Sequence, residues 1–224
     1  MIVRGEDISR DFLRKRRGSN VFTAVRSCNI ELRAGEISVI MGRSGSGKST
    51  LLNMLSGILK PTTGRVMYDE TDIYSLDDTA LSAFRNENIG FVPQGKSAVA
   101  SLTVLENVMI PKLLYGGRDE ERAMELLSLF GIADLKDVMP AELSGGELRR
   151  MAIARALINS PGVLFCDEPT GDLDNENTKA VFDALYRVAD NGSAVFIVTH
   201  EDDARLFANR LYVMDAGVIN EVKV

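Results

Sequence analysis

A glycine-rich stretch within residues 36–59 limits the local fold that this chain can adopt. An apolar run at residues 37–41 precedes the glycines and predicts a β-strand, and leucine and methionine residues follow them at helical spacing. Between these elements the residues that match the pattern GxxxxGK[ST] are Gly42, Gly47, Lys48 and Ser49. The sequence therefore predicts one strand–loop–helix unit that binds phosphate.

The residue types of this loop suit a nucleoside triphosphate. Glycine lets the backbone take conformations that a side chain would obstruct, so successive N–H groups turn toward phosphate oxygens at the positive end of the following helix. Lys48 adds a charge for the β and γ phosphates, Ser49 a hydroxyl for Mg²⁺ and Thr50 a hydroxyl for the α phosphate. The alternative, a glycine-rich turn with one exposed lysine, leaves both flanking elements unexplained. We therefore expect ATP or GTP to contact the loop residues Gly42, Arg43, Ser44, Gly45, Ser46, Gly47, Lys48, Ser49 and Thr50.

The composition is that of an ordinary globular protein. Of the 224 residues, 45% are hydrophobic and 26% are charged. No apolar run approaches the ~18 residues of a membrane span, and the N-terminal residues lack the apolar core of a signal peptide. We expect the chain to stay in the cytoplasm unless a partner holds it at a membrane.

The charge balance argues against one class of partner. The net charge is −6, whereas broad nucleic-acid binding usually leaves a basic excess, so we expect no nucleic-acid partner. The exception is the basic run at residues 14–17. Such a run is typical of a solvated loop, and a contact with a nucleotide edge or a membrane surface is the alternative.

Three regions of the chain differ in hydrophobic pattern. Residues 1–33 alternate loosely, which predicts antiparallel strands joined by the basic run. Residues 95–160 carry apolar residues at helical spacing, whereas strands and helices alternate from residue 161 onward. We expect one α/β domain with a core at 1–94 and 161–224, an N-terminal antiparallel β subdomain and an inserted helical subdomain at 95–160.

Polar residues follow three further apolar runs. These residues, which lie at or just beyond the ends of such runs, are Gln94, the pair Asp167 and Glu168, and His200. Ligands of open α/β sheets bind at the carboxyl ends of the strands, so these groups should meet the phosphate loop at one edge. Because adjacent residues on a strand point to opposite sides, the two acids should have different roles, one near Mg²⁺ and one near an attacking water. The alternatives are two solvated acids and a structural histidine.

A serine–glycine turn supports two interpretations. Ser144 with Glu147 three residues later makes a capping box at the start of a helix, and the glycines between them would only bend the chain. Yet a serine hydroxyl and the unobstructed amides of Gly145 and Gly146 at a helix N-terminus also make an anion site. The residues alone leave both interpretations open.

Taken in order, these motifs resemble the nucleotide-binding domain of ABC ATPases. The segments GRSGSGKST, LSGGE, VLFCDE and GDLD, together with Gln94 and His200, are similar to its Walker A, signature, Walker B and D-loop motifs, its Q-loop and its switch histidine. In that family two domains associate head to tail, and the signature of one completes the ATP site of the other. The residues that this resemblance adds to the ATP site of a homodimer are Ser144, Gly145, Gly146 and Asp174.

The resemblance implies Mg²⁺-dependent ATP hydrolysis and assigns roles within the site. Phosphoryl transfer to water depends on positioning and charge stabilisation. Lys48 would therefore hold the phosphates, Glu168 the attacking water and His200 the γ phosphate. The groups implied to hold Mg²⁺ are Ser49, Gln94 and Asp167.

Phe12 and Phe22 are the two aromatic residues that could stack on the base of the nucleotide. On pattern alone, Phe12 and Phe22 are typical of a core or a sheet surface. The resemblance points instead to Phe12 as the ring that stacks on adenine, in place of the usual tyrosine.

Three stretches, at 101–117, 143–157 and 167–174, are similar to one subgroup of the family. This subgroup contains macrolide exporters, lipoprotein-releasing ATPases, antimicrobial-peptide ATPases and the cell-division ATPase. Two departures occur. LRR follows LSGGE where QQR is usual, which we expect to be neutral, and residues 95–101 lack the usual aromatic, which weakens any inference about the membrane partner.

The resemblance implies a function in a membrane complex. The chain would be the ATP-hydrolysing subunit, held at the inner face of the cell membrane by separate transmembrane permease chains. One alternative is a transport-independent ABC ATPase that acts on a cytosolic or cell-division partner. Another is a regulatory module that binds ATP without hydrolysing it.

Overall fold

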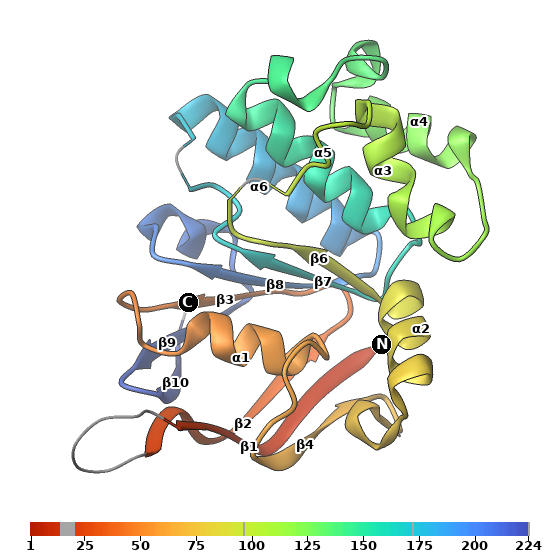
Figure 1. The fold of residues 1–224 in the computed structure, drawn as a ribbon. Helices are drawn as coiled ribbons and strands as arrows, with labels where there is room; N and C mark the ends of the chain where they lie inside the picture. The colour runs from red at the N-terminus through yellow and green to blue at the C-terminus, as the bar shows by residue number, and fades with distance from the viewer. Residues whose placement is uncertain (14–20, 96, 172, 224) are drawn as a thin grey trace.

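The computed structural model describes residues 1–13, 21–95, 97–171 and 173–223. The basic run at residues 14–17 lies outside these ranges. The described residues form two β-sheets, and helices cover both faces of the larger sheet (Figure 1).

The smaller sheet is antiparallel. Its strands lie in the order β2, β1, β4 and β5, with bounds Val21–Arg33, Ile2–Leu13, Thr63–Tyr68 and Thr71–Asp72. Strands β1 and β2 pair along most of their length, from Ile2 opposite Arg33 to Leu13 opposite Val21. The antiparallel N-terminal strands predicted from alternation are confirmed.

The larger sheet has six strands and is mostly parallel. Its order is β10, β9, β3, β8, β7 and β6, with bounds Val218–Val222, Arg210–Asp215, Ile37–Met41, Ala194–Thr199, Val163–Asp167 and Ile89–Val92. Strands β9, β3, β8, β7 and β6 run parallel, and β10 is antiparallel to β9. Every residue of β3, β7 and β8 is buried, as expected for parallel strands that are covered on both faces.

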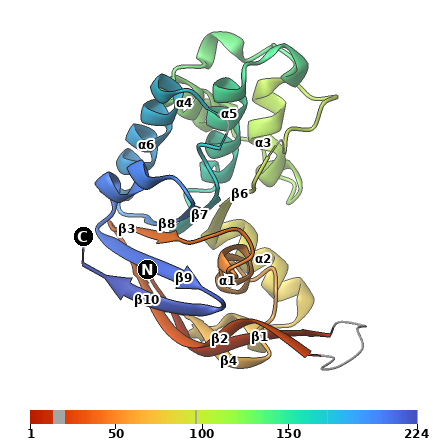
Figure 2. The same ribbon diagram turned by 90° about the vertical axis from the view of Figure 1, so that its left-hand side faces the viewer.

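Successive residues of the central strands face two different hydrophobic cores. Ile37 and Val39 pack in one core with α3 (Val104–Leu113), α4 (Glu120–Leu129), α5 (Gly145–Leu157) and α6 (Asn175–Asp190). Ile40 packs in the other core with α1 (Lys48–Leu55) and the smaller sheet. Figure 2 shows α1 between the two sheets and α3–α6 on the opposite side of the larger sheet. The phosphate loop is thus fixed between a buried strand and a buried helix.

The remaining helices complete the element list. Helix α2 spans Asp78–Asn88, and short 3-10 helices span Ile73–Ser75, Ala133–Leu135, Pro140–Glu142 and Asp202–Phe207. Among the described residues, none of the helices has the length and apolarity that crossing a membrane requires.

Candidate nucleotide-binding site

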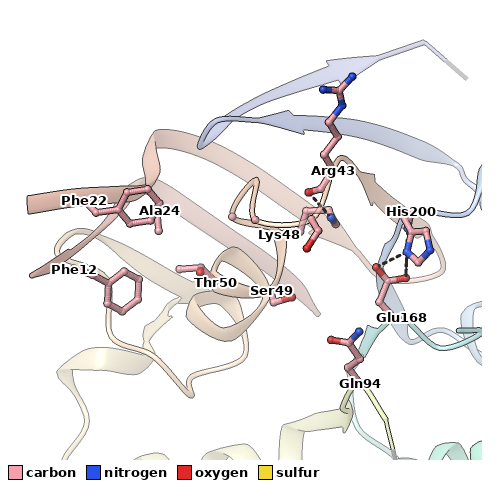
Figure 3. A pocket seen from close by; sticks show the side chains of 13 residues that line it. Phe12, Phe22, Ala24, Arg43, Lys48, Ser49, Thr50, Gln94, Glu168 and His200 are labelled. Atoms are coloured by element: carbon pink, nitrogen blue, oxygen red, sulfur yellow. Dashed lines mark hydrogen bonds and ion pairs between the residues drawn. The ribbon is translucent and has the colours of Figure 1, made fainter. Parts of the chain in front are cut away.

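The carboxyl ends of four parallel strands meet at one pocket. The loop after β3, the residue pair after β6, the acids after β7 and the histidine after β8 all reach the same edge of the sheet. Beside them lies a pocket of about 800 Å³, which Figure 3 shows from close by. Its lining consists of Phe12, Phe22, Ala24, Arg43, Ser44, Gly45, Gly47, Lys48, Ser49, Thr50, Gln94, Glu168 and His200.

The backbone of the phosphate loop is in conformations that favour glycine. Gly42 has φ +155° and Gly47 has φ +112°. A Cβ atom would lie 2.2 Å from the Met214 carbonyl oxygen at Gly42 and 2.3 Å from the Ala24 carbonyl oxygen at Gly47. Neighbouring backbone therefore forbids a side chain at both positions, and the glycines of the pattern have a steric reason.

Lys48 places its ammonium group inside the loop. Its side chain is buried, and Nζ donates hydrogen bonds to the carbonyl oxygens of Gly42 at 2.6 Å and Arg43 at 3.1 Å. Ser46 is also buried, and its hydroxyl has no hydrogen-bond partner among the described residues. A cation and a spare hydroxyl within a glycine loop fit a phosphate group.

The acid that ends β7 lies beside the serine that begins α1. Ser49 Oγ donates to Asp167 Oδ1 at 3.2 Å. Burial raises the pKa of Asp167, and the hydrogen bond from Ser49 and the charge of Lys48 oppose that rise. No cluster of three or more His, Cys, Asp or Glu side chains suited to a metal occurs in the described part of the chain. The oxygen atoms of Ser49, Gln94 and Asp167 nevertheless fit Mg²⁺, which takes few protein ligands and keeps several waters.

Glu168 does not continue the strand. Strand β7 ends at Asp167, and Glu168 has φ +49°, in the left-handed region. We had expected Asp167 and Glu168 to point to opposite sides because adjacent strand residues do so. That reason was wrong, because Glu168 lies beyond the strand and the backbone turns between the two acids. Glu168 lines the pocket, whereas Asp167 does not line it and contacts Ser49.

His200 contacts Glu168 directly. Its Nδ1 atom lies 3.0 Å from each carboxylate oxygen of Glu168 (Figure 3). The hydrogen bond to Glu168 and the negative charge of that carboxylate raise the pKa of His200. The pair joins the ends of β7 and β8, neighbouring strands of the sheet.

Two phenylalanines lie at the other end of the pocket. Phe12 and Phe22 are partners across the β1–β2 pairing, and both are partly buried (Figure 3). The guanidinium of Arg10 lies 4.8 Å from the ring centroid of Phe12. Phe22, weighed with Phe12 as a ring that could stack on a base, lines the pocket as Phe12 does. Ala24 also lines the pocket but was not among the predicted site residues. The alternation of β2 gives no signal for Ala24, because its position depends on how the strand lies against the phosphate loop.

The serine–glycine turn lies outside this pocket. Ser144 caps α5, accepting from the Glu147 backbone N–H at 3.3 Å while its own N–H donates to the Glu147 carboxylate at 2.7 Å. The predicted capping box is thus confirmed, although the helix begins at Gly145 and contains both glycines. A Cβ atom at Gly146 would lie 2.2 Å from Asn177 Oδ1, which places the start of α5 against the start of α6.

Asp174 also caps a helix. It is exposed, and its carboxylate accepts from the Asn177 backbone N–H at 2.8 Å at the start of α6. Ser144, Gly145, Gly146 and Asp174 are thus predicted site residues that lie outside the pocket of their own chain. Gly42, Ser46 and Asp167 do not line the pocket either, but they belong to the phosphate loop or contact Ser49 beside it.

Comparison with known proteins identifies the family to which the chain belongs. The sequence profile of the ABC transporter family matches residues 25–171. The lipoprotein-releasing system ATP-binding protein LolD 2 of Chlorobium chlorochromatii is 37% identical over 215 residues, which cover 92% of this chain and 89% of the relative. The methionine import ATP-binding protein MetN of Latilactobacillus sakei is 40% identical over 210 residues, which cover 92% of this chain and 61% of that relative. A dimeric post-hydrolysis structure of the ATP-binding cassette MJ0796, bound to ADP and Pi, aligns with a TM-score of 0.87 at 32% identity over 99% of both chains.

The strand–loop–helix unit and the pocket at the carboxyl ends of parallel strands define a P-loop nucleoside triphosphatase. The profile match and the relatives carry the assignment further, and the chain belongs to the ABC transporter family. It is an ATP-binding ATPase with the predicted fold, a P-loop core with an antiparallel β-sheet at the N-terminus.

Proposed function

We propose that this chain is the ATP-hydrolysing subunit of a membrane ABC complex that exports compounds, extracts lipoproteins or lipids, or confers resistance to antimicrobial peptides. The names of its LolD relatives support lipoprotein release as the first system to test. Transmembrane permease chains would be separate and would hold this chain at the inner face of the cell membrane. The observation that carries the ATPase role is the convergence of four strand ends on one pocket.

Within this pocket we assign roles by position. Lys48, already inside the loop, holds the β and γ phosphates together with the backbone N–H groups of residues 42–50. Glu168 orients the attacking water, His200 contacts the γ phosphate, and Gln94 closes the site from the side of β6. Phe12 stacks on adenine at the end of the pocket away from His200, beside Phe22, which lines the same pocket.

Ser49, Gln94 and Asp167 are the proposed holders of Mg²⁺. The contact between Ser49 Oγ and Asp167 Oδ1 supports this assignment, because it brings a hydroxyl and a carboxylate together at the end of the phosphate loop. When bound, the ion neutralises charge that develops on the phosphates. Asp167 would contact the ion through Ser49 or water, because its carboxylate is hydrogen-bonded to Ser49 and it does not line the pocket.

The turn that begins α5 would act in trans. Ser144 and Gly145 are exposed in the single chain and lie outside its own pocket, and Asp174 is exposed beside them. A head-to-tail homodimer places Ser144, Gly145 and Gly146 of one copy over the triphosphate held by the other. ATP that contacts both copies stabilises the closed dimer, and hydrolysis removes that stabilisation.

A groove near the predicted helical subdomain suits the permease. It has a volume of about 340 Å³ and lies where α2 and α3 meet the end of α1. Its exposed apolar residues include Ile58, Leu114 and Tyr115. A short apolar helix from a permease chain would fit this groove. The groove also lies between the proposed core, residues 1–94 and 161–224, and the proposed helical subdomain at 95–160.

The test is the substitution Glu168→Gln. It removes the negative charge near the water while keeping the shape of the side chain, so we expect turnover to fall by more than ~100-fold and ATP-dependent dimers to accumulate. Phosphate release and size-exclusion chromatography with ATP measure the two effects. Glu125→Gln, in an exposed ion pair on α4, is the matched control. Unchanged turnover in Glu168→Gln would remove the catalytic assignment.

A further inference from the structure

A buried arginine on α5 connects two parts of the ATP site. The side chain of Arg149 is largely inaccessible, with 8% relative exposure. One terminal nitrogen of its guanidinium donates to the Pro93 carbonyl oxygen at 2.9 Å, and the other donates to the Glu168 carbonyl oxygen at 3.1 Å. Pro93 directly precedes Gln94, so one side chain bridges the backbone of the β6 loop and that of the acid after β7.

This arginine lies in the segment after LSGGE that departs from the usual family sequence, a difference that we expected from the sequence to be neutral. LRR follows LSGGE in this chain where QQR is usual, and Arg149 is the middle residue of that run. The structure places it in the interior, where burial lowers the pKa of its guanidinium and the charge of Asp167 partly opposes that effect. A buried arginine is costly unless it is hydrogen-bonded, and here a backbone carbonyl accepts from each of its two terminal nitrogens. The departure therefore places a buried guanidinium, in contact with two backbone carbonyls, where the usual residue is a glutamine.

The contact with Glu168 falls on a strained backbone. Glu168 is a non-glycine residue at φ +49°, a conformation that persists only when its surroundings hold it. Its N–H donates to the Val198 carbonyl at 2.8 Å, and its carbonyl accepts from Arg149 and from the Gly171 N–H at 3.3 Å. Arg149 is thus one of three groups that hold the Glu168 backbone, while His200 contacts the carboxylate itself.

We propose that Arg149 is a positioning residue for ATP hydrolysis: its guanidinium fixes the Glu168 backbone relative to the Pro93–Gln94 segment, so that the Glu168 carboxylate and the Gln94 side chain face the same pocket. This inference rests on the proposed role of Glu168. Helix α5 also begins with the serine–glycine turn that we propose contacts the ATP of the second copy. The Arg149 guanidinium therefore joins this helix to the hydrolytic residues of its own chain. The planar fork of arginine is what allows one side chain to serve two carbonyls at once.

A second arginine on the same helix provides the matched control. Arg155 donates to the Ser97 carbonyl at 2.7 Å and to the Ser97 hydroxyl at 2.6 Å. It therefore holds the same loop after β6, three residues beyond Gln94, but through Ser97 rather than through the Glu168 backbone. Burial lowers the pKa of Arg155 as it does that of Arg149. Loss of either arginine disturbs the packing of α5, whereas loss of Arg149 alone releases Glu168.

The experiment compares Arg149→Gln, Arg149→Lys and Arg155→Gln in the full chain at saturating MgATP. We expect kcat to fall about tenfold in Arg149→Gln with KM for ATP within about twofold, because ATP still binds while Glu168 is misdirected. Arg149→Lys, which can keep one of the two carbonyl contacts, should lie between it and the wild type. Arg155→Gln should lose less than about threefold. Thermal unfolding of each variant checks that the proteins remain folded at the assay temperature.

Three results would overturn the inference. The first is a kcat for Arg149→Gln within about twofold of the wild type. The second is an equal loss in Arg149→Gln and Arg155→Gln, which would place the effect in α5 packing. The third applies where Arg149→Gln is not folded: wild-type kcat in a folded Arg149→Lys would then exclude the two-carbonyl bridge. Retained turnover in Glu168→Gln would instead overturn the proposed function, so the two failures are distinguishable.

Discussion

The imidazole of His200 and the carboxylate of Glu168 form one hydrogen-bonded unit, with Nδ1 3.0 Å from each carboxylate oxygen. Their surroundings differ, because the His200 side chain is 69% exposed and the Glu168 side chain only 11%. The carboxylate raises the pKa of the histidine, so protonated His200 is favoured in the folded chain. The contribution of this charged contact to stability is fully present below the unfolded-state pKa near 6.5. It is lost as the pH rises through the higher folded-state pKa.

This relationship predicts the titration of His200. The chain contains one histidine, so its ring resonances are unique in an NMR spectrum. We expect a pKa above the ordinary value in the wild type and a clear decrease in Glu168→Gln, which removes the largest cause of the shift. Glu201→Gln is the control, since Glu201 raises the pKa of His200 less than Glu168 does. An equal decrease in both variants would contradict the assigned contact.

The phosphate loop predicts a difference between two glycine substitutions. Gly47→Ala adds a Cβ atom 2.3 Å from the Ala24 carbonyl oxygen at φ +112°, so backbone must move. Gly192→Ala, at φ +95° with open space around it, carries only the conformational cost. We expect the free energy of unfolding to fall by more than ~2 kcal/mol in Gly47→Ala and by about 1 kcal/mol in Gly192→Ala. Urea denaturation without nucleotide measures both, and similar losses would argue against the close approach of β2 to the loop.

Much of the site could be predicted because its signals are local. The phosphate loop is a continuous pattern flanked by a strand and a helix, and Gln94 and His200 each follow an apolar run. The rule that ligands bind at the carboxyl ends of parallel strands then brought distant positions to one edge. The pocket shared by Lys48, Gln94, Glu168 and His200 agrees with that reasoning.

Other features depend on contacts that no local pattern contains. The left-handed backbone of Glu168 is held by groups from β8 and α5, and strand alternation could not predict it. Arg149 lies 56 positions from Pro93 and 19 from Glu168, so its bridge exists only once α5 packs on the sheet. Phe22 reaches the pocket only because the hairpin of β1 and β2 lies beside the loop.

The proposed head-to-tail dimer predicts a cross-link that a single chain does not form. In the Glu168→Gln background, Ser44→Cys at the phosphate loop and Ser144→Cys at the start of α5 introduce thiols at two exposed positions. If the turn of one copy closes over the triphosphate of the other, a short bifunctional reagent should double the chain mass when ATP is present and not when it is absent. Replacing Ser144→Cys by Ser128→Cys, exposed on α4, gives the matched control. The native thiols are poor targets, because burial raises the pKa of Cys28 to about 11 and that of Cys166 to about 12. ATP-independent doubling, or equal doubling in the Ser128→Cys control, would show that the serine–glycine turn does not meet the ATP of a second copy.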